Sequence, residues 1–300
     1  MNRVKLLLAA LLVAATQPAW AALNVFACTP EWGSLAVELG GDKANVFNAT
    51  SAMQDPHRIE ARPSLIARAR SADLVVCTGA ELEVGWLPLV QTQSGNARIQ
   101  TGQAGYFEAA SHVELIEKPQ RVDRSMGDVH AAGNPHIHLD PRNIAKVAAA
   151  LSERMIALDS AQSAHYRERT RTFLDRWSSA IAEWERRAAP LKGVPLVVYH
   201  RNLSYLMRWL GMRDVGNLEP KPGLPPTTAH LAELLAQLQR DPAKAVVRSA
   251  YNDPRPAQWL AERVRIPSIP VPFTVGGTER AKDLFGLFDD TLARLLEVAK

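Results

Sequence analysis

Residues 142–189 contain neither glycine nor proline, and this segment constrains the fold more than any other. Apolar residues recur in it at helical spacing, for example Phe173, Trp177, Ile181 and Trp184. Asp159 offers an N-cap, so the segment divides into two helices, the second over about residues 161–189. At 1.5 Å per residue, a helix over that range would be about 43 Å long. Such a length suits a strut between two lobes better than the core of one.

Short strands and helices alternate on both sides of this strut. Apolar, β-prone runs predict strands over residues 23–28, 44–49, 73–77, 194–199, 245–249 and 266–271. Prolines interrupt the last run, which places it at a sheet edge. Helical patterns occupy residues 32–39, 63–71, 203–210, 227–239, 255–264 and 279–298. The predicted fold class is α/β, with two Rossmann-like lobes of parallel strands bridged by a long rigid α-helix and a default ligand site in the cleft between them.

The N-terminus has the layout of a secretory signal peptide. Arg3 and Lys5 precede an apolar run of about 11 residues, and small residues flank a cleavage site after Ala21. A membrane-spanning helix would need an apolar run of roughly 20 residues. We therefore expect a periplasmic protein without a stable membrane anchor. Its expected parts are a signal peptide (1–21), an N-terminal lobe (22–141), connecting helices (142–190) and a C-terminal lobe (191–300).

Charge and cysteine content exclude two classes of protein. The chain has 35 Lys and Arg against 31 Asp and Glu, whereas a nucleic-acid partner would require clustered basic residues. Its two cysteines are too few for a disulfide scaffold. Cys28 ends the first predicted strand and Cys77 the third, and these strands can be neighbours in a doubly wound lobe. An oxidising compartment would then permit a single disulfide, and the alternative is two buried free cysteines.

Three of the eight histidines lie where a ligand site is expected. His57 follows the second predicted strand, and His200 directly follows the strand at residues 194–199. His136 lies in a proline-bounded loop at the end of the first lobe. Three neutral imidazoles converging in a cleft would form a nitrogen-rich site suited to zinc, with a fourth position for a carboxylate or water.

Several segments together resemble one known family. They are DPHRIEARPS around His57, NPHIHLDPRN around His136, VVYHRNLSYLMRWLG around His200, and GWLPLV and GNLEPKPGLPPTTAHL elsewhere. Over about residues 23–297 the chain is similar to the periplasmic solute-binding proteins of zinc and manganese ABC importers. The resemblance implies that His57, His136 and His200 hold a metal between the lobes, and that ABC permease subunits are the partners. We also expect a monomer.

The fourth ligand is left open by a departure from that family. Many relatives supply an acid before a glycine near the end of the second lobe, but residues 266–277 contain none. Without a hard oxygen ligand, preference moves from manganese towards zinc. The alternatives for the fourth position are water or one of four side chains close to the motifs: Asp55, Glu60, His130 and His138. The two histidines share a stretch that is either an exposed loop or an auxiliary metal-collecting one. Glu219 and Asp253 lie in loops of the second lobe and can equally be structural.

The expected function is capture of Zn²⁺ and its delivery to a membrane permease, without covalent chemistry. One alternative is a zinc-dependent hydrolase, because three histidines and a water also form a catalytic zinc shell. The sequence contains no His-Glu-x-x-His and no Gly-x-Ser-x-Gly motif in support of it. Two further functions stay open on the same scaffold: binding of manganese or another divalent metal, and adhesion.

Overall fold

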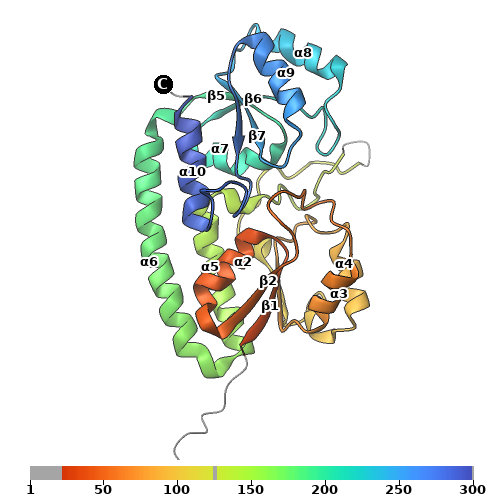
Figure 1. Cartoon of the computed structure of the whole chain (residues 1–300), viewed down its shortest axis with the longest axis vertical. Coiled ribbons are helices and arrows are strands. Elements are labelled where there is room, and N and C mark those ends of the chain that lie inside the picture. The colour runs from red at the N-terminus through yellow and green to blue at the C-terminus, as the bar shows by residue number, and fades with distance from the viewer. Residues whose placement is uncertain (1–21, 124–126, 299–300) are drawn as a thin grey trace, which may run out of the picture.

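The computed structural model describes residues 22–123 and 127–298. Two α/β lobes lie one above the other, and one long helix runs along the side of both (Figure 1). The predicted signal peptide and its cleavage site after Ala21 lie outside the described residues. Among those residues, none of the helices is long and apolar enough to cross a membrane.

The N-terminal lobe contains a parallel sheet in the order β2-β1-β3-β4. Its strands are β1 (Leu23–Ala27), β2 (Ala44–Asn48), β3 (Leu74–Cys77) and β4 (Tyr106–Glu108). Its helices are α2 (Pro30–Gly40), α3 (Pro63–Arg70) and α4 (Leu87–Ser94). Successive β1 side chains point to opposite faces, so that Val25 packs with α2 and Phe26 packs with α3 and α4. Both faces of the sheet are therefore covered, as parallel sheets require.

The C-terminal lobe repeats this architecture, with a parallel sheet in the order β6-β5-β7-β8. Its strands are β5 (Pro195–Val198), β6 (Arg213–Asn217), β7 (Ala245–Ser249) and β8 (Ser268–Val271). Its helices are α7 (Ser204–Leu210), α8 (Thr228–Leu238), α9 (Pro254–Val264) and α10 (Leu284–Leu296). The proline-interrupted strand β8 is at the edge of the sheet, as predicted.

Two helices connect the lobes: α5 (Pro141–Leu158) and α6 (Ser163–Ala188). The predicted break between them is confirmed, because a short 3-10 helix at Ser160–Gln162 separates the two. Other 3-10 helices occupy Gly41–Lys43, Ala97–Ile99, Ala109–His112, Ile137–Leu139, Ala189–Leu191 and Arg201–Leu203. The 26 residues of α6 contact α2 in the first lobe and α10 in the second (Figure 1).

The hydrophobic core is continuous through both lobes. A single cluster of buried side chains includes Leu74 of the first sheet, Val198 of the second, and Trp177 and Trp184 of α6. Trp184 stacks on Phe288 of α10, with ring centroids 4.9 Å apart. Burial of this aromatic surface holds α6 against α10 of the C-terminal lobe, and its contacts with α2 make α6 a bridge between the lobes.

Cys28 and Cys77 form a disulfide, which confirms the pairing considered from the sequence. Strand β1 pairs with β3 so that Ala27 lies opposite Val76, and the two cysteines follow directly with Cα atoms 4.8 Å apart. Both side chains are fully buried. The strands β4 and β6 and the helix α4 were not predicted. Strand β6 buries only Val215 among its five residues, and β4 has only three residues, so neither produces a clear alternating pattern.

Candidate metal centre

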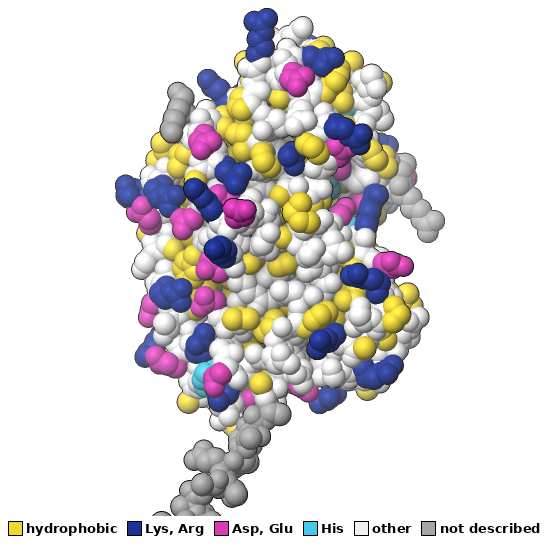
Figure 2. Space-filling model, viewed as in Figure 1, with side chains coloured by type: hydrophobic (Ala, Val, Ile, Leu, Met, Phe, Trp, Pro, Cys, Tyr) yellow, Lys and Arg dark blue, Asp and Glu magenta, His cyan; other side chains and the backbone are white. Residues whose placement is uncertain are grey.

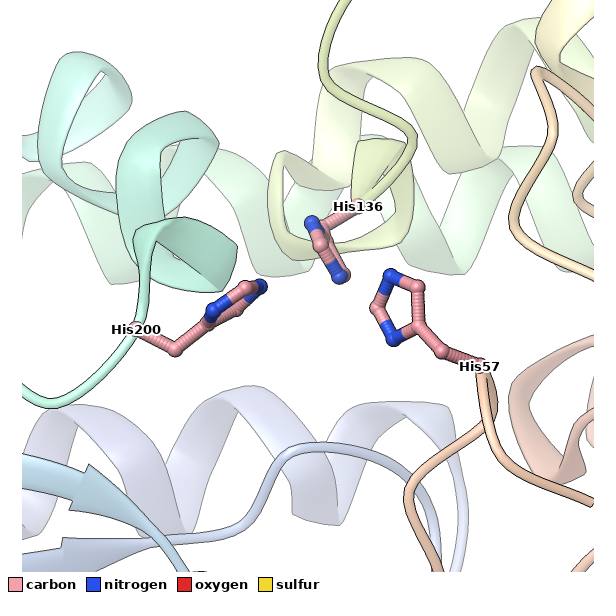
Figure 3. Close-up of side chains that lie close together, drawn as sticks. All are labelled: His57, His136 and His200. Carbon is pink, nitrogen blue, oxygen red and sulfur yellow. The ribbon is translucent and has the colours of Figure 1, made fainter. Parts of the chain in front are cut away.

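His57, His136 and His200 converge at the cleft between the lobes. His57 lies in the loop between β2 and α3, His136 directly precedes the 3-10 turn at Ile137–Leu139, and His200 follows β5. One ligand nitrogen from each ring lies within 4.8 Å of those of the other two. Figure 3 shows the three rings turned towards one another from separate segments of the chain. The sequence prediction that these residues meet agrees with this geometry.

Each ring in this trio is oriented by an oxygen at its Nδ1 atom. Nδ1 of His57 lies 2.8 Å from Oδ1 of Asp55, and Nδ1 of His200 lies 2.7 Å from Oε2 of Glu219. Nδ1 of His136 lies 2.8 Å from Oδ1 of Asn134. An oxygen acceptor at Nδ1 keeps the ring hydrogen there and leaves a lone pair on Nε2. Buried Nε2 of His136 has no hydrogen-bond partner among the described residues.

The tripeptide Asx-Pro-His produces this orientation twice. In residues 55–57, Oδ1 of Asp55 accepts hydrogen bonds from both the backbone N–H and the ring of His57. In residues 134–136, Oδ1 of Asn134 accepts the same two hydrogen bonds from His136. A short polar side chain two residues before a histidine can thus fix both its backbone and its ring. This signal was present in the sequence, and Asn134 was missed there.

Burial and the neighbouring histidines keep the ring of His136 neutral. His136 is 2% exposed and His200 is 8% exposed. Burial, followed by the nearby His200 and His57, holds the pKa of His136 well below its ordinary value. Neutral imidazole is the form that binds a metal ion, so His136 can bind a cation at neutral pH without losing a proton.

The two carboxylates beside the trio contact the Nδ1 atoms of His57 and His200, and no cluster of ligand atoms among the described residues includes either of them. Burial acts to raise the pKa of Asp55, but its hydrogen bonds with His57 outweigh this and hold that pKa below its ordinary value. Glu219 also accepts a hydrogen bond from the backbone N–H of Gly223. Such carboxylate–histidine pairs fix the tautomer and raise the basicity of a ligating nitrogen.

The remaining predicted site residues have different positions. Nε2 of His130 lies 3.3 Å from Nε2 of His57, at the edge of the trio. Glu60 is exposed, and among the described residues neither Glu60 nor His130 belongs to a cluster whose ligand atoms all lie within 4.8 Å of one another. His138 is fully buried and its Nε2 donates to the carbonyl of Phe273, so its ring is used away from the trio. Asp253 caps α9 and pairs with Arg255.

The stretch that lacks the expected acid nevertheless reaches the site. The ring of Phe273 meets that of His136 edge-on, with centroids 5.7 Å apart. An aromatic edge therefore occupies one side of the trio, and no carboxylate comes from residues 266–277. On another side, a cavity of about 540 Å³ borders the group and opens it to small solutes. His130, His136 and His200 all line this cavity.

Comparison with known proteins finds the substrate-binding components of zinc and manganese importers. The family model described as zinc-uptake complex component A, periplasmic (ZnuA), matches residues 25–298. The chain is 21% identical over 227 residues to the high-affinity zinc uptake system protein ZnuA of Bacillus subtilis, which covers 74% of this chain and 69% of that protein. It is 22% identical over 263 residues to the manganese ABC transporter substrate-binding lipoprotein scaA of Streptococcus gordonii, covering 87% and 83%.

Solved structures share the same fold. A crystal structure of ZnuA superimposes with a TM-score of 0.76 at 17% identity, covering 93% of this chain and 98% of that one. A manganese-bound periplasmic metal-binding protein from Candidatus Liberibacter asiaticus gives a TM-score of 0.75 at 16% identity, covering 93% and 100%. Because the family model spans nearly the whole described chain, the protein belongs to the periplasmic zinc-uptake component A (ZnuA) family.

Proposed function

We propose that this protein captures Zn²⁺ in an exported compartment and delivers it to an ABC-type permease, with His57, His136 and His200 as ligands. The observation that carries the proposal is the convergence of three imidazoles whose Nδ1 atoms each face an oxygen. This arrangement directs three Nε2 lone pairs to one place. Three nitrogen donors in a tetrahedral arrangement are typical of zinc sites.

The donor set supports zinc over manganese. Manganese favours carboxylate, carbonyl and water oxygens, whereas imidazole suits zinc. The nearby carboxylates of Asp55 and Glu219 are engaged at the Nδ1 atoms of His57 and His200. The ring of Phe273 lies against that of His136, and its segment, residues 266–277, contains no acid that could supply an oxygen ligand. The named relatives include both zinc and manganese proteins, so the donor set is the feature that distinguishes this chain.

The family also supports the compartment and the partner. Its model is described as periplasmic, and several relatives are named as substrate-binding components of ABC transporters. We infer that cleavage after Ala21 yields a monomer that delivers the ion to the permease subunits of an ABC importer. Figure 2 shows acidic and basic side chains interspersed over the viewed face, without a large field of either sign. Long-range attraction to a strongly charged polymer is therefore not supported by this face.

Metal titration tests the proposal. Metal-free protein titrated calorimetrically with Zn²⁺ should show about one tight site, and Mn²⁺ should bind much more weakly. Metal analysis of protein purified from its exported compartment should find zinc. Tighter binding of Mn²⁺ than of Zn²⁺ would contradict the choice of metal. Absence of Zn²⁺ binding, or metal-dependent turnover of ester or peptide substrates, would contradict the function itself.

A further inference from the structure

His130 is an imidazole beside the trio that has no part in the resemblance to known motifs. It lies in the segment between the 3-10 helix Ala109–His112 and α5, and its Nε2 atom points at Nε2 of His57 across 3.3 Å. The centroids of the two rings are 5.3 Å apart, which is as close as His57 lies to the other members of the trio. His130 also lines the cavity that borders His136 and His200.

The 3.3 Å between the two Nε2 atoms is the spacing of two ligands on one zinc ion. Zn–N bonds of about 2.0–2.1 Å at the tetrahedral angle place two ligand nitrogens about 3.3–3.4 Å apart. In the absence of metal, two Nε2 atoms at this distance can form a hydrogen bond with each other. His57 keeps its ring hydrogen towards Asp55, so Nε2–H of His130 is the donor and Nε2 of His57 the acceptor.

The segment that carries His130 is attached to both lobes. The backbone N–H of Ala131 donates to Oε2 of Glu81 in the N-terminal lobe, at 2.7 Å. The backbone N–H of Asp128 donates to the carbonyl of Pro222 in the C-terminal lobe, at 2.8 Å. These bonds hold the His130 ring over the side of the trio that faces the cavity, directly against His57.

We infer that His130 supplies the fourth zinc ligand, so that four imidazole nitrogens enclose the ion. This inference rests on the proposed function and deepens it. On binding, the hydrogen on Nε2 of His130 moves to Nδ1 by exchange with water, and the freed lone pair binds the ion, so no net proton is released at this ring. A shell of four nitrogens needs neither the missing acid nor a water, and it leaves no open position for hydrolytic chemistry.

Counting the imidazoles on the bound ion tests this directly. X-ray absorption of the Zn²⁺-loaded protein should fit four imidazole nitrogens, and His130→Ala should fit three with one oxygen. The Kd for Zn²⁺ should rise at least about 10-fold in His130→Ala, which is the smallest cost seen even for groups outside the ligand shell. His112→Ala is the matched control, because His112 is exposed and stacks on Phe107. It should alter neither the ligand count nor the Kd.

The outcomes separate this inference from the proposed function. If wild-type protein already shows three imidazoles and an oxygen, or if His130→Ala and His130→Asn leave count and Kd unchanged, the inference is overturned. The proposed function stands in that case, provided that His136→Ala abolishes tight binding. If the wild-type protein binds no Zn²⁺ at all, both the proposed function and this inference are contradicted.

Discussion

His136 and His138 are two residues apart on one turn, but their side chains have different roles: His136 is a candidate metal ligand, and His138 is part of the contact between the lobes. Both are buried, at 2% and 0% exposure. Nε2 of His136 has no protein partner among the described residues and faces His57 and His200. Nε2 of His138 donates to the carbonyl of Phe273, and its Nδ1 lies 3.6 Å from Oε1 of Glu31. Each ring has one hydrogen-bonded nitrogen and one buried nitrogen without a hydrogen bond among the described residues. What distinguishes the metal-ligand candidate is therefore the surroundings of its free nitrogen, which are His57 and His200 for His136 and Glu31 for His138.

The His138 side of this pair joins the lobes. Glu31 lies at the start of α2 in the N-terminal lobe and is fully buried. It accepts hydrogen bonds from the hydroxyl of Thr29 and from that of Thr274, which follows β8 in the C-terminal lobe. His138 completes this junction by donating to Phe273 next to Thr274. A polar network in so dry a place stabilises the fold only while all its members are present.

Removing Glu31 should have the largest effect, and it should affect stability alone. Glu31→Ala leaves the two buried hydroxyls of Thr29 and Thr274 without their acceptor, so the free energy of unfolding of metal-free protein should fall by about 3–5 kcal/mol. Urea denaturation measures this, and the Kd for Zn²⁺ should stay close to that of wild type. Glu60→Ala is the control, because Glu60 is exposed. A loss below about 1 kcal/mol would mean that the junction is not important for stability.

Removing His136 should have the opposite effect: it should weaken Zn²⁺ binding more than it lowers stability. Structural zinc sites bind with about 10–16 kcal/mol shared over four ligands, so one ligand contributes about 3 kcal/mol. His136→Ala should therefore weaken Zn²⁺ binding by at least about 100-fold. Competition with a chromophoric chelator would measure the change, and His138→Asn would serve as the comparison. Equal losses of affinity in both variants would erase the distinction between the two histidines.

Removing Glu219 should have a smaller effect on the same site. Its carboxylate orients His200 through Nδ1, and loss of such a partner typically costs 10–100-fold in metal affinity. Glu219→Ala should therefore weaken Zn²⁺ binding by about 10–100-fold in the same competition assay. Asp253→Ala is the matched control from the same lobe, because Asp253 pairs with Arg255 away from the trio. An unchanged Kd in Glu219→Ala would show that the His200 ring is positioned without it.

The smallest expected effect is on the pH dependence of the stability of the metal-free protein. Burial, followed by His57 and His200, lowers the pKa of His130 to about 4, and the pKa of His136 is also held well below 6.5. Below pH 6.5 the unfolded chain therefore binds protons that the folded chain excludes, so metal-free protein loses stability as pH falls towards about 4. Burial raises the pKa of Glu83 to about 7, which acts in the opposite direction.

A variant comparison isolates the histidine contribution. Denaturation of metal-free wild type and His136→Ala at several pH values between about 7 and about 5 should show a shallower loss in the variant, by up to roughly 1.4 kcal/mol per pH unit. Glu83 is common to both proteins and cancels in the difference. Parallel curves for the two proteins would show that His136 is not kept neutral by the fold.

Most of the fold, and the convergence of His57, His136 and His200, could be predicted from the sequence. Buried strands such as β3 and β5 are continuous apolar runs; His200 comes just after β5, and His57 lies in the loop that follows β2. The two roles within the His-x-His pair could not be separated, because they depend on the direction each ring takes from a tight 3-10 turn. The contact of Glu31 with Thr274 was equally invisible, since 243 residues separate the two. Neither residue belongs to a periodic pattern that predicts a partner.

The core that passes through both sheets also determines when folding can finish. A chain is made from its N-terminus, and separate domains normally fold in that order as they appear. Here the face of the first sheet that packs on α2 belongs to the same cluster as Leu287 and Leu292 of α10, close to the end of the chain. The N-terminal lobe therefore keeps an unfinished apolar face until the last helix is made. A chain truncated before α10 should behave as an aggregation-prone intermediate and not as a folded N-terminal lobe followed by an incomplete C-terminal lobe.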